Sequence, residues 1–286
     1  MKNILKVFAF FFLSLLCIYA GCKNEQGKKG KKTIILATTT SVQDTGLLDK
    51  MISAFENSNG YIVKPVAVGS GQAISLGKRG EADVLFVHSP EDEEEFMKEG
   101  FGVSRKLVMS NYFMVAGPLE DPAGAKGAGT ILKVFQKIFE KKAIFVSRGD
   151  KSGTDVIEKK LWKMSGINPE GNKWYIETGA GMGQTLSIAS EKGAYTLTDN
   201  ATFIKLKKSL KLQTIEEENG KIKNEYHVIR VNPVKFKWIN AEGGKILFDF
   251  MISRKVCDII KNFGMKEYGV SLFQPGCSLD NNGKVN

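Results

Sequence analysis

The chain has 286 residues, 42% of them hydrophobic and 25% charged, so it can bury one large core or two moderate ones. Its 41 basic and 31 acidic residues give a formal net charge of +10. Much of this excess lies between residues 22 and 32, where five lysines stand against one glutamate. Nucleic-acid binding loses its main support if the chain is exported, as the N-terminal segment described next indicates, because an exported protein would not meet nucleic acid.

The first 21 residues have the features of an export signal. A basic start precedes an apolar run from Ile4 to Ala20, which is short for a membrane span. Small residues precede Cys22 as at a lipoprotein processing site, although Tyr19 occupies the position where such sites normally have leucine. We expect residues 1–21 to be a lipoprotein signal peptide and Cys22 to carry the lipid. The alternatives are plain signal cleavage nearby or an uncleaved anchor.

Residues 22–32 are polar, rich in lysine and glycine, and without apolar periodicity. This composition is typical of a flexible tether. A lysine-rich arm next to a lipid anchor suits an anionic membrane surface. The sequence therefore predicts an exported protein that is anchored to the cell membrane on its periplasmic or extracytoplasmic face.

Cysteine and histidine are too few for a metal site of the usual kind. Beyond Cys22 only Cys257 and Cys277 remain, and they either form a disulfide in an oxidising compartment or stay free. The chain has no CxxC pair and only two histidines, so a zinc site is not expected. We expect neither a metal nor a cofactor.

Strand-like and helix-like segments alternate from residue 32 to residue 118. Apolar runs predict strands at 32–39, 61–70, 82–89 and 107–118, and the segments between them predict helices at 45–60, 71–81 and 90–100. This order is typical of a mostly parallel sheet with helices on its faces.

The alternation starts again after a Gly-rich segment at 117–129. It predicts helices at 131–142, 154–166 and 182–193, with strands at 143–150, 172–179 and 194–200. A turn and a strand are expected within 213–233, and one long amphipathic helix at 242–264. The pattern predicts an α/β protein of two lobes, lobe 1 at 33–116 plus 225–286 and lobe 2 at 117–224. Hinge strands are expected near residues 112–118 and 225–233.

Hydroxyl and glycine residues follow predicted strands at five places, each before a helix or at a strand end. The residues are Thr38, Thr39, Thr40 and Ser41; Ser70; Ser147, Arg148, Ser152 and Thr154; the Gly-rich turn at 178–183; and Thr196 and Thr198. In open α/β sheets ligands bind beyond the carboxyl ends of the strands, and helix N-termini favour anions. We expect these loops to converge on one cleft that holds one arginine. Each loop taken alone is also compatible with a plain N-cap or turn, and Arg148 with a surface pair to Asp150.

Many neutral donors and one guanidinium suit a small oxyanion. A fully deprotonated oxyanion needs only donors, whereas protonated phosphate also needs an acceptor. Asp44 and Asp155 stand close to these loops, and the sequence does not show whether either faces the cleft.

Several segments resemble the tungstate-binding proteins of ABC importers. They include "LATTTSVQDTGLL", "VAVGSGQAISLGKRGEADVLFVHS", "FVSRGDKSGT" and "WYIETGAGMGQTLSIASEKGAYTLTD", and the resemblance extends from Ile35 to Pro275. It implies a type II periplasmic-binding-protein fold whose two α/β lobes close around tungstate and deliver it to a permease. The oxyanion contacts expected from the motifs and the loops together are Thr39, Thr40, Ser41, Ser70, Arg148, Ser152 and Thr154.

The sequence departs from that family in a few places. Ser70 stands where the family typically has threonine, and Lys151 and Asp155 stand where aspartate and histidine are expected. These changes concern the identity of the anion more than the mode of binding. Molybdate is a close competitor of tungstate, and phosphate and sulfate remain alternatives. The expected partners are the anion, a permease with its ATPase and the membrane lipid, and the protein is expected to be a monomer.

An enzyme is the remaining alternative. The segment "GSGQAISLGKR" lacks the Ser or Thr that follows Gly-Lys in a P-loop, and Gln184 stands where a dinucleotide-binding turn has its third glycine. None of the five loops contains histidine, and no nucleophile–base–acid set is recognisable. We therefore expect no catalysis.

Overall fold

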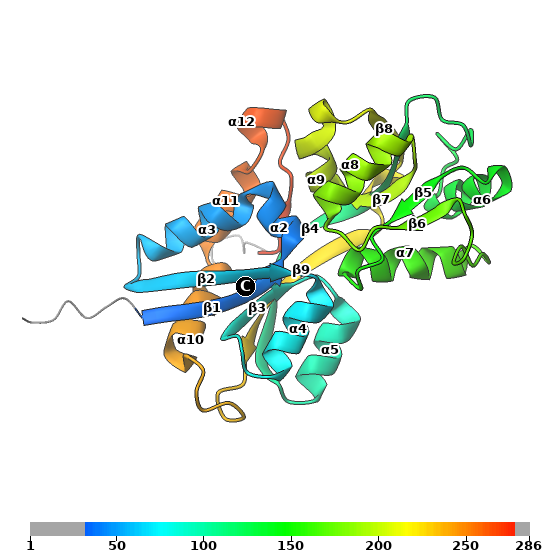
Figure 1. Cartoon of the computed structure of the whole chain (residues 1–286). Helices are drawn as coiled ribbons and strands as arrows, with labels where there is room; N and C mark the ends of the chain where they lie inside the picture. The colour runs from blue at the N-terminus through cyan, green and yellow to red at the C-terminus, as the bar shows by residue number, and fades with distance from the viewer. Residues whose placement is uncertain (1–31, 278–286) are drawn as a thin grey trace, which may run out of the picture. The chain divides into compact units, whose positions relative to one another are not determined.

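Alternating apolar strands and amphipathic helices form the first part of the fold. The computed structural model describes residues 32–277, and strands and helices alternate up to its longest strand (Figure 1). These elements are β1 (Lys32–Thr39), α2 (Thr40–Thr45), α3 (Leu47–Glu56), β2 (Tyr61–Val68), α4 (Ser70–Lys78), β3 (Val84–Val87), α5 (Pro90–Lys98) and β4 (Gly102–Pro118).

The second part continues the alternation and then returns to the first. Its elements are α6 (Ile131–Lys141), β5 (Phe145–Ser147), α7 (Gly153–Met164), β6 (Tyr175–Glu177), α8 (Met182–Lys192), β7 (Thr196–Asp199), α9 (Asn200–Leu206) and β8 (Leu212–Glu216). The returning elements are β9 (Lys223–Val231), α10 (Ala241–Met251), α11 (Arg254–Asn262), α12 (Met265–Tyr268) and β10 (Gln274–Pro275).

The strands form a mixed arrangement around β4. The main sheet has the order β10-β4-β9-β3-β1-β2, in which β1 pairs with β3 in parallel whereas β9 runs antiparallel to both β3 and β4. The far end of β4 pairs with β7 and β8 instead. The expectation of a mostly parallel sheet is therefore wrong for this part, because β9 returns from the second half and inserts between β3 and β4.

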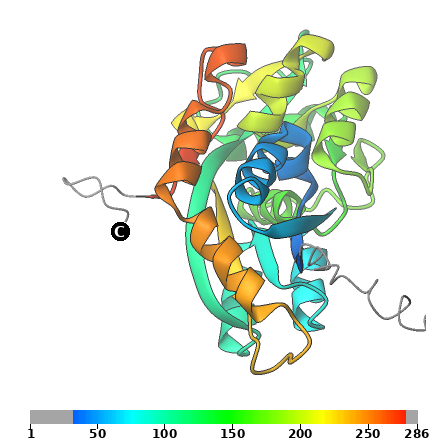
Figure 2. The same ribbon diagram turned by 90° about the vertical axis from the view of Figure 1, so that its left-hand side faces the viewer.

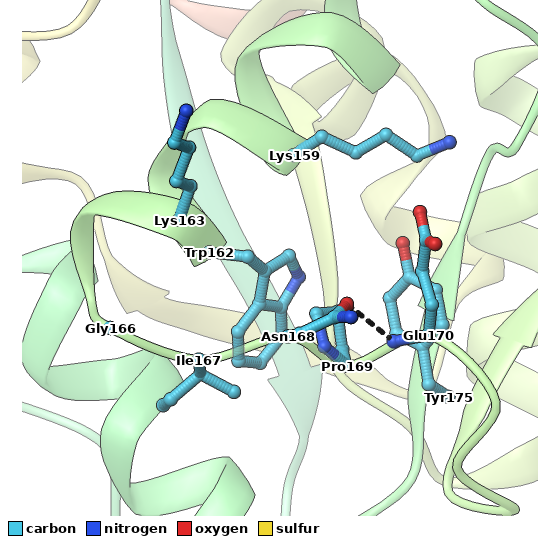
Figure 3. A pocket seen from close by; sticks show the side chains of 9 residues that line it. All are labelled: Lys159, Trp162, Lys163, Gly166, Ile167, Asn168, Pro169, Glu170 and Tyr175. Carbon is cyan, nitrogen blue, oxygen red and sulfur yellow. Dashed lines mark hydrogen bonds between the residues drawn. The ribbon is translucent and has the colours of Figure 1, made fainter.

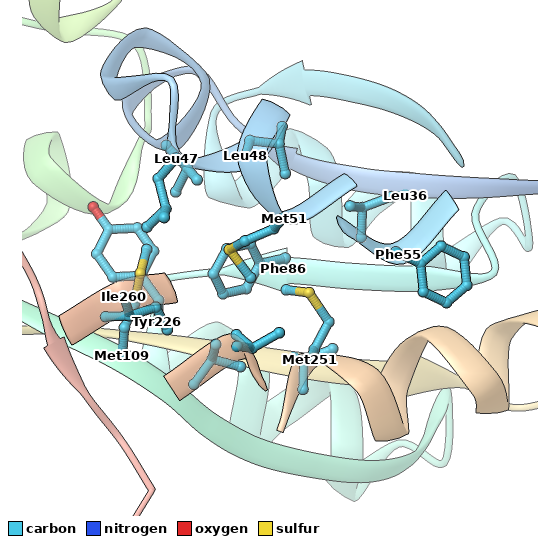
Figure 4. Close-up of a cluster of buried hydrophobic side chains, with 14 of the residues drawn as sticks. Leu36, Leu47, Leu48, Met51, Phe55, Phe86, Met109, Tyr226, Met251 and Ile260 are labelled. Atoms are coloured by element: carbon cyan, nitrogen blue, oxygen red, sulfur yellow. The ribbon is translucent and has the colours of Figure 1, made fainter. Parts of the chain in front are cut away.

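The main sheet carries a hydrophobic core on each face. Alternate residues of β3 point to opposite faces, as the strand period requires, so that Phe86 packs in one cluster and Leu85 in the other. The first cluster includes residues of α3, α10 and α11 (Figure 4), and the second includes residues of α4 and α5. We call the elements packed on these two clusters lobe 1.

The far end of β4 also has a core on each side. Phe113 and Val115 pack with residues of α6 and α7, whereas Met114 and Ala116 pack with residues of α8 and α9. We call these elements lobe 2. Because β4 contributes to the cores of both lobes, it is a continuous connection between them.

The long helix expected at 242–264 is two helices, and that expectation is wrong. Helix α10 ends at Met251, and α11 starts after Ser253, whose hydroxyl accepts a hydrogen bond from the amide of Val256. Both helices pack on the same face of the main sheet as α3, and Figure 2 shows them in orange, one after the other. A disulfide joins Cys257 of α11 to Cys277, which settles the question that the sequence left open.

Three expected features lie outside the described residues: the signal peptide (1–21), the lipid on Cys22 and nearly all of the tether (22–32). Within residues 32–277, no helix is both long and apolar enough to cross a membrane.

Candidate functional site

Loops at strand ends of the two lobes meet between them. Gly69 precedes α4 in lobe 1, and its hypothetical Cβ would lie 3.6 Å from Ser152, the N-cap of α7 in lobe 2. A Cβ on Gly71 would lie 3.3 Å from the carbonyl oxygen of Lys151. The loops therefore approach backbone to backbone, and the missing side chains of the glycines make this approach possible.

A second set of contacts lies beside the first. The N-cap of α8 is Gly181, whose hypothetical Cβ would lie 3.5 Å from the Thr40 hydroxyl oxygen, and that of Gly183 the same distance from Asp44 Oδ2. Four of the five predicted loops therefore meet at one place, which we call the interlobe site.

The exception is the end of β7. The hydroxyls of Thr196 and Thr198 donate to backbone carbonyls next to them in the chain, at 3.4 and 3.1 Å. They are not among the residues that we assign to the interlobe site.

Arg148 is a buried cation in this site. It follows β5 directly and is only 2% exposed. Its Nε donates to the Ala180 carbonyl oxygen at 3.3 Å, and an Nη donates to Asp150 Oδ2 at 2.5 Å. Arg148 therefore pairs with Asp150, as the plain interpretation expects, but it is buried between the loops and is not a surface residue. The pairing leaves the site with little net charge of its own.

Three of the predicted hydroxyls have a hydrogen atom for which the described residues provide no acceptor. The oxygens of Thr40 and Thr154 are buried and have no hydrogen-bond partner among the described residues. Ser70 Oγ accepts a bond from the backbone amide of His88 at 3.3 Å, which leaves its own hydrogen unused. Buried polar groups normally find partners, so these hydroxyls are available to a ligand.

The other three predicted hydroxyls have partners within the protein. Thr39 Oγ1 and Ser41 Oγ are 3.2 Å apart and satisfy each other. Ser152 Oγ accepts the amide hydrogen of Asp155 at 3.4 Å as the N-cap of α7. These contacts do not prevent ligand binding. They nevertheless make the plain capping interpretation fit Thr39, Ser41 and Ser152 better than it fits Thr40, Ser70 and Thr154.

His88 is a member of this site that the sequence pattern did not reveal. It follows β3 directly, is 3% exposed, and its Nε2 lies 3.5 Å from Ser41 Oγ. Burial, with a contribution from the nearby Arg148 charge, lowers its pKa to about 4, so the imidazole is neutral at pH 7. No histidine stands in the five loops, as the sequence showed, yet His88 touches three of them. Its position at the end of a buried strand was the available signal.

Hydrogen bonds link His88 to four further buried polar residues, and sequence reasoning missed all of them. They are Asn111 in β4, Asp199 at the end of β7, and Asn224 and Tyr226 in β9. A polar group inside or at the end of an apolar strand was the only signal for them.

The two aspartates near the loops differ in their surroundings. Asp155 is buried, and its Oδ2 accepts the amide hydrogen of Lys151 at 3.0 Å, which is a hydrogen bond within the loop that precedes α7. Asp44 is exposed at the rim, although partial burial still raises its pKa. A cavity of about 410 Å³ at this rim is lined by residues of both lobes, among them Thr40, Asp44, Gly183, Thr202 and Lys205. Asp44 therefore borders the interlobe site at the rim, and Asp155 Oδ1 is a second carboxylate oxygen there, buried and without a hydrogen-bond partner among the described residues.

A second cavity, of about 430 Å³, lies wholly within lobe 2 and away from the loops of the interlobe site (Figure 3). The rings of Trp162 and Tyr175 form part of its wall. Its Lys159 is already paired with Asp155 and Glu177. This cavity contains none of the predicted binding residues.

Within residues 32–277, no three side chains of His, Cys, Asp or Glu are grouped so that they could hold a metal ion.

Comparison with known proteins identifies the family. The model of the PBP superfamily domain matches residues 24–255. The tungstate-binding protein TupA of Peptoclostridium acidaminophilum is 42% identical, over 97% of this chain and 100% of that protein.

Solved structures agree with the sequence comparison. The structure described as the tungstate ABC transporter from Geobacter sulfurreducens superposes with a TM-score of 0.74 at 40% identity, covering 82% of this chain and 100% of that one. The tungstate-binding protein TupA from Desulfovibrio alaskensis G20 gives a TM-score of 0.71 at 38% identity, over 85% and 98% of the two chains. The chain has the periplasmic-binding-protein fold and belongs to the family of tungstate-binding proteins within the PBP superfamily.

Proposed function

We propose that the protein is the substrate-binding lipoprotein of an ABC importer and captures tungstate between its two lobes. The observation that carries this proposal is the placement of Arg148. It is buried in the loop before α7, donates to the Ala180 carbonyl in the loop before α8, and belongs to the same interlobe site as the unpartnered hydroxyls of Thr40 and Thr154. Helix N-termini and unused donors attract an anion, and the relatives named above are tungstate-binding proteins.

The anion contacts that we propose are the hydroxyls of Thr39, Thr40, Ser41, Ser70, Ser152 and Thr154 and the guanidinium of Arg148. An anion that touches loops of both lobes favours the closed arrangement over an open one by its difference in affinity for the two. We place the lobe boundaries at 33–116 plus 225–286 and 117–224, although the last residues before this boundary, 113–116, pack into the cores of lobe 2. The hinge would lie where β4 and β9 pass between the lobes.

The protein would act as an exported monomer whose Cys22 carries a lipid. It would hand its ligand to a membrane permease driven by an ATPase. Neither a cofactor nor catalysis is part of this proposal.

Molybdate is the closest alternative ligand, because it has the same charge and nearly the same size as tungstate. Phosphate is favoured by one specific observation, the carboxylate of Asp44 at the rim, which could accept the proton of a protonated anion. Sulfate carries no proton and would need only donors.

One contact also favours an enzyme. Ser41 Oγ, His88 Nε2 and Asn224 follow each other like a nucleophile, a base and the residue that orients the base. However, Ser41 is only 2% exposed, and the hydroxyls of Thr39 and Tyr226 surround its oxygen at 3.2 and 3.5 Å. Because these two hydroxyls compete with His88 for the Ser41 hydroxyl, the contact is not a dedicated nucleophile–base pair. Incubation with common phosphate esters should therefore show no turnover.

Calorimetric titration of the chain from Lys23 onward, with tungstate, molybdate, sulfate and phosphate in separate runs, tests the proposal. We expect one-to-one binding that is tightest for tungstate. Arg148→Ala should weaken it by about a hundredfold, more than the loss of any single hydroxyl, because hydrogen bonds to charged groups are worth roughly twice neutral ones. The control is Arg79→Ala, which removes an exposed arginine paired with Glu81 and should bind like the wild type. An Arg148→Ala protein with wild-type affinity would refute the site.

A further inference from the structure

One loop of lobe 1 exposes two large apolar side chains to solvent. Residues 232–240 join β9 to α10, below α10 in Figure 1, and we call them the Trp238 loop. Val234 is 74% exposed and Trp238 is 70% exposed, more than any other large apolar residue that the structure describes. Single exposed apolar residues are common on protein surfaces, but two on one short loop, one of them a tryptophan, indicate an interaction site.

The fold itself holds these side chains outward. The indole Nε1 of Trp238 donates to the Gly80 carbonyl at 2.9 Å, and the amide of the Asn232 side chain donates to the Gly100 carbonyl at 2.8 Å. Between the two exposed residues Phe236 is buried against Gly80, where an added Cβ would lie 2.7 Å from its ring. The exposure of the tryptophan is therefore a fixed feature of the surface, because its one polar atom is already bound.

Lysines alternate with these apolar residues. Lys235 and Lys237 are both exposed. The acidic residues beside the two glycines that the loop contacts are Glu81 and Glu99, and each is paired with a basic side chain, at 2.7 and 2.6 Å. Tryptophan favours the headgroup level of a bilayer, and lysine is attracted to anionic headgroups. The composition of the loop therefore fits a membrane surface.

The Trp238 loop lies where the chain enters the fold. The side-chain amide of Asn240 donates to the Thr33 carbonyl at 2.8 Å. The Asp83 carboxylate accepts the backbone amides of both Ile35 and Asn240, at 2.7 and 2.6 Å. The end of the loop is thus fastened to the start of β1.

The length of the tether limits which surface can reach the membrane. Cys22, the proposed lipid carrier, precedes Thr33 by eleven residues. A chain of that length spans at most about 40 Å. A compact unit of roughly 250 residues has a radius of gyration of about 18 Å, so the path around it to the far side is longer than the tether. The surface near Thr33, which includes the Trp238 loop, is within reach of the membrane.

We propose that the Trp238 loop is a membrane contact, in which Val234 and Trp238 lie at the headgroup level of a bilayer and Lys235 and Lys237 bind its anionic phospholipids. The inference rests on the proposed function, because the lipid on Cys22 brings the loop to the bilayer. Each lysine near an anionic surface favours the contact only about fivefold, so the loop binds weakly by itself. The tether raises its effective concentration at the membrane and makes this weak affinity sufficient.

Tryptophan fluorescence in brominated vesicles tests the contact. The chain has three tryptophans, and Trp162 and Trp174 are buried, at 1% and 7% exposure. The mature lipidated protein is reconstituted in vesicles of phosphatidylcholine and phosphatidylglycerol whose acyl chains carry bromine near the headgroups. We expect a loss of emission relative to vesicles without bromine. Trp238→Phe should abolish this loss, because the two remaining indoles are shielded by protein.

Lipid charge and two matched variants complete the test. Lys237→Ser should lower the ratio of contacting to free loops about fivefold in vesicles with phosphatidylglycerol. Lys192→Ser, at an exposed lysine of α8 in lobe 2, should not. Leu119→Trp, combined with Trp238→Phe, places an indole at a position of lobe 2 that is 59% exposed and should not be quenched. Unchanged tungstate affinity shows that each variant is folded.

The outcomes separate this inference from the proposed function. If bromine does not quench Trp238 in a lipidated protein that binds tungstate, the inference alone is wrong. Equal quenching in the Leu119→Trp variant would also overturn it, since the protein would then adhere by any surface. A mature chain without lipid on Cys22 would overturn the proposed anchor and the inference together. A loop that docks on the permease instead would show no quenching, and Trp238→Ala would abolish tungstate-stimulated ATP hydrolysis by the reconstituted importer.

Discussion

Gly153 at the start of α7 lies directly against His88 at the end of β3. A Cβ at position 153 would collide with the His88 carbonyl oxygen and would lie 2.9 Å from its Nδ1. The two residues belong to different lobes, so this contact joins the lobes beside the interlobe site. It requires that residue 153 has no side chain.

Gly153→Ala should therefore hinder closure of the lobes. The added methyl group meets backbone, which cannot move aside, and overpacking of this kind costs about 1–3 kcal/mol. We expect the affinity for the anion to fall at least about tenfold in calorimetry, with a smaller change in thermal stability. Gly60→Ala is the control, because a Cβ there meets nothing within 4 Å. Equal affinities for the two variants would show that closure does not depend on this contact.

The unpartnered hydroxyls of Thr40 and Thr154 should separate stability from function. Replacing either residue by valine removes a buried polar group that has no partner, so the ligand-free protein should become more stable by about 1 kcal/mol. The same change removes a donor from the site and should weaken anion binding severalfold. Denaturant unfolding and calorimetry measure the two effects.

Thr45→Val is the matched control for these two variants. The Thr45 hydroxyl already donates to the Val42 carbonyl at 2.7 Å, so its loss should lower stability and leave binding unchanged. If Thr40→Val and Thr154→Val destabilise the ligand-free protein as Thr45→Val does, their hydroxyls have partners after all.

Glu158 should make stability depend on pH. Burial raises the pKa of this carboxyl from its ordinary 4.5 to about 8, and the Tyr175 hydroxyl donates to its Oε1 at 2.8 Å. Between these pH values the folded protein holds a proton that the unfolded chain has released. The free energy of unfolding therefore falls as the pH rises from about 5 to about 8, by up to about 1.4 kcal/mol per unit.

Glu158→Gln cannot ionise, so it should lose this dependence and gain stability over the wild type as the pH rises. Thermal unfolding at several pH values measures the difference. The exposed Glu170 provides the control variant Glu170→Gln, which should follow the wild type. Parallel curves for Glu158→Gln and the wild type would mean that Glu158 is ionised in the folded protein.

The disulfide between Cys257 and Cys277 should stabilise lobe 1 without affecting the site. The two cysteines are 20 residues apart in sequence, and closing a loop of that size contributes about 3 kcal/mol. We expect reductant to lower the stability of the wild type, and the double variant Cys257→Ser, Cys277→Ser to unfold at lower denaturant and to be insensitive to reductant. Its anion affinity should be unchanged, because α11 packs on the outer core of lobe 1. A large loss of affinity would contradict this.

Local patterns predicted most elements because each repeats over several residues. The strand expected at 32–39 has those bounds in the structure, and the helix expected at 131–142 is α6. The helix expected at 242–264 failed because a single capping serine, Ser253, interrupts an apolar pattern that continues on both sides. The antiparallel β9 was not foreseeable, because the direction of a strand depends on a partner far away in the chain.

The amino-acid sequence by itself determined the α/β alternation, the family and the residue types at the strand ends, since these depend on periodicity and on short motifs. It placed Thr40, Ser70, Arg148 and Thr154 in loops that the structure brings together. Only the tertiary structure decided which hydroxyls lack partners and how His88 is protonated. Those properties depend on hydrogen bonds between residues as far apart as Asn111 and Asp199, whose polarity no local pattern records.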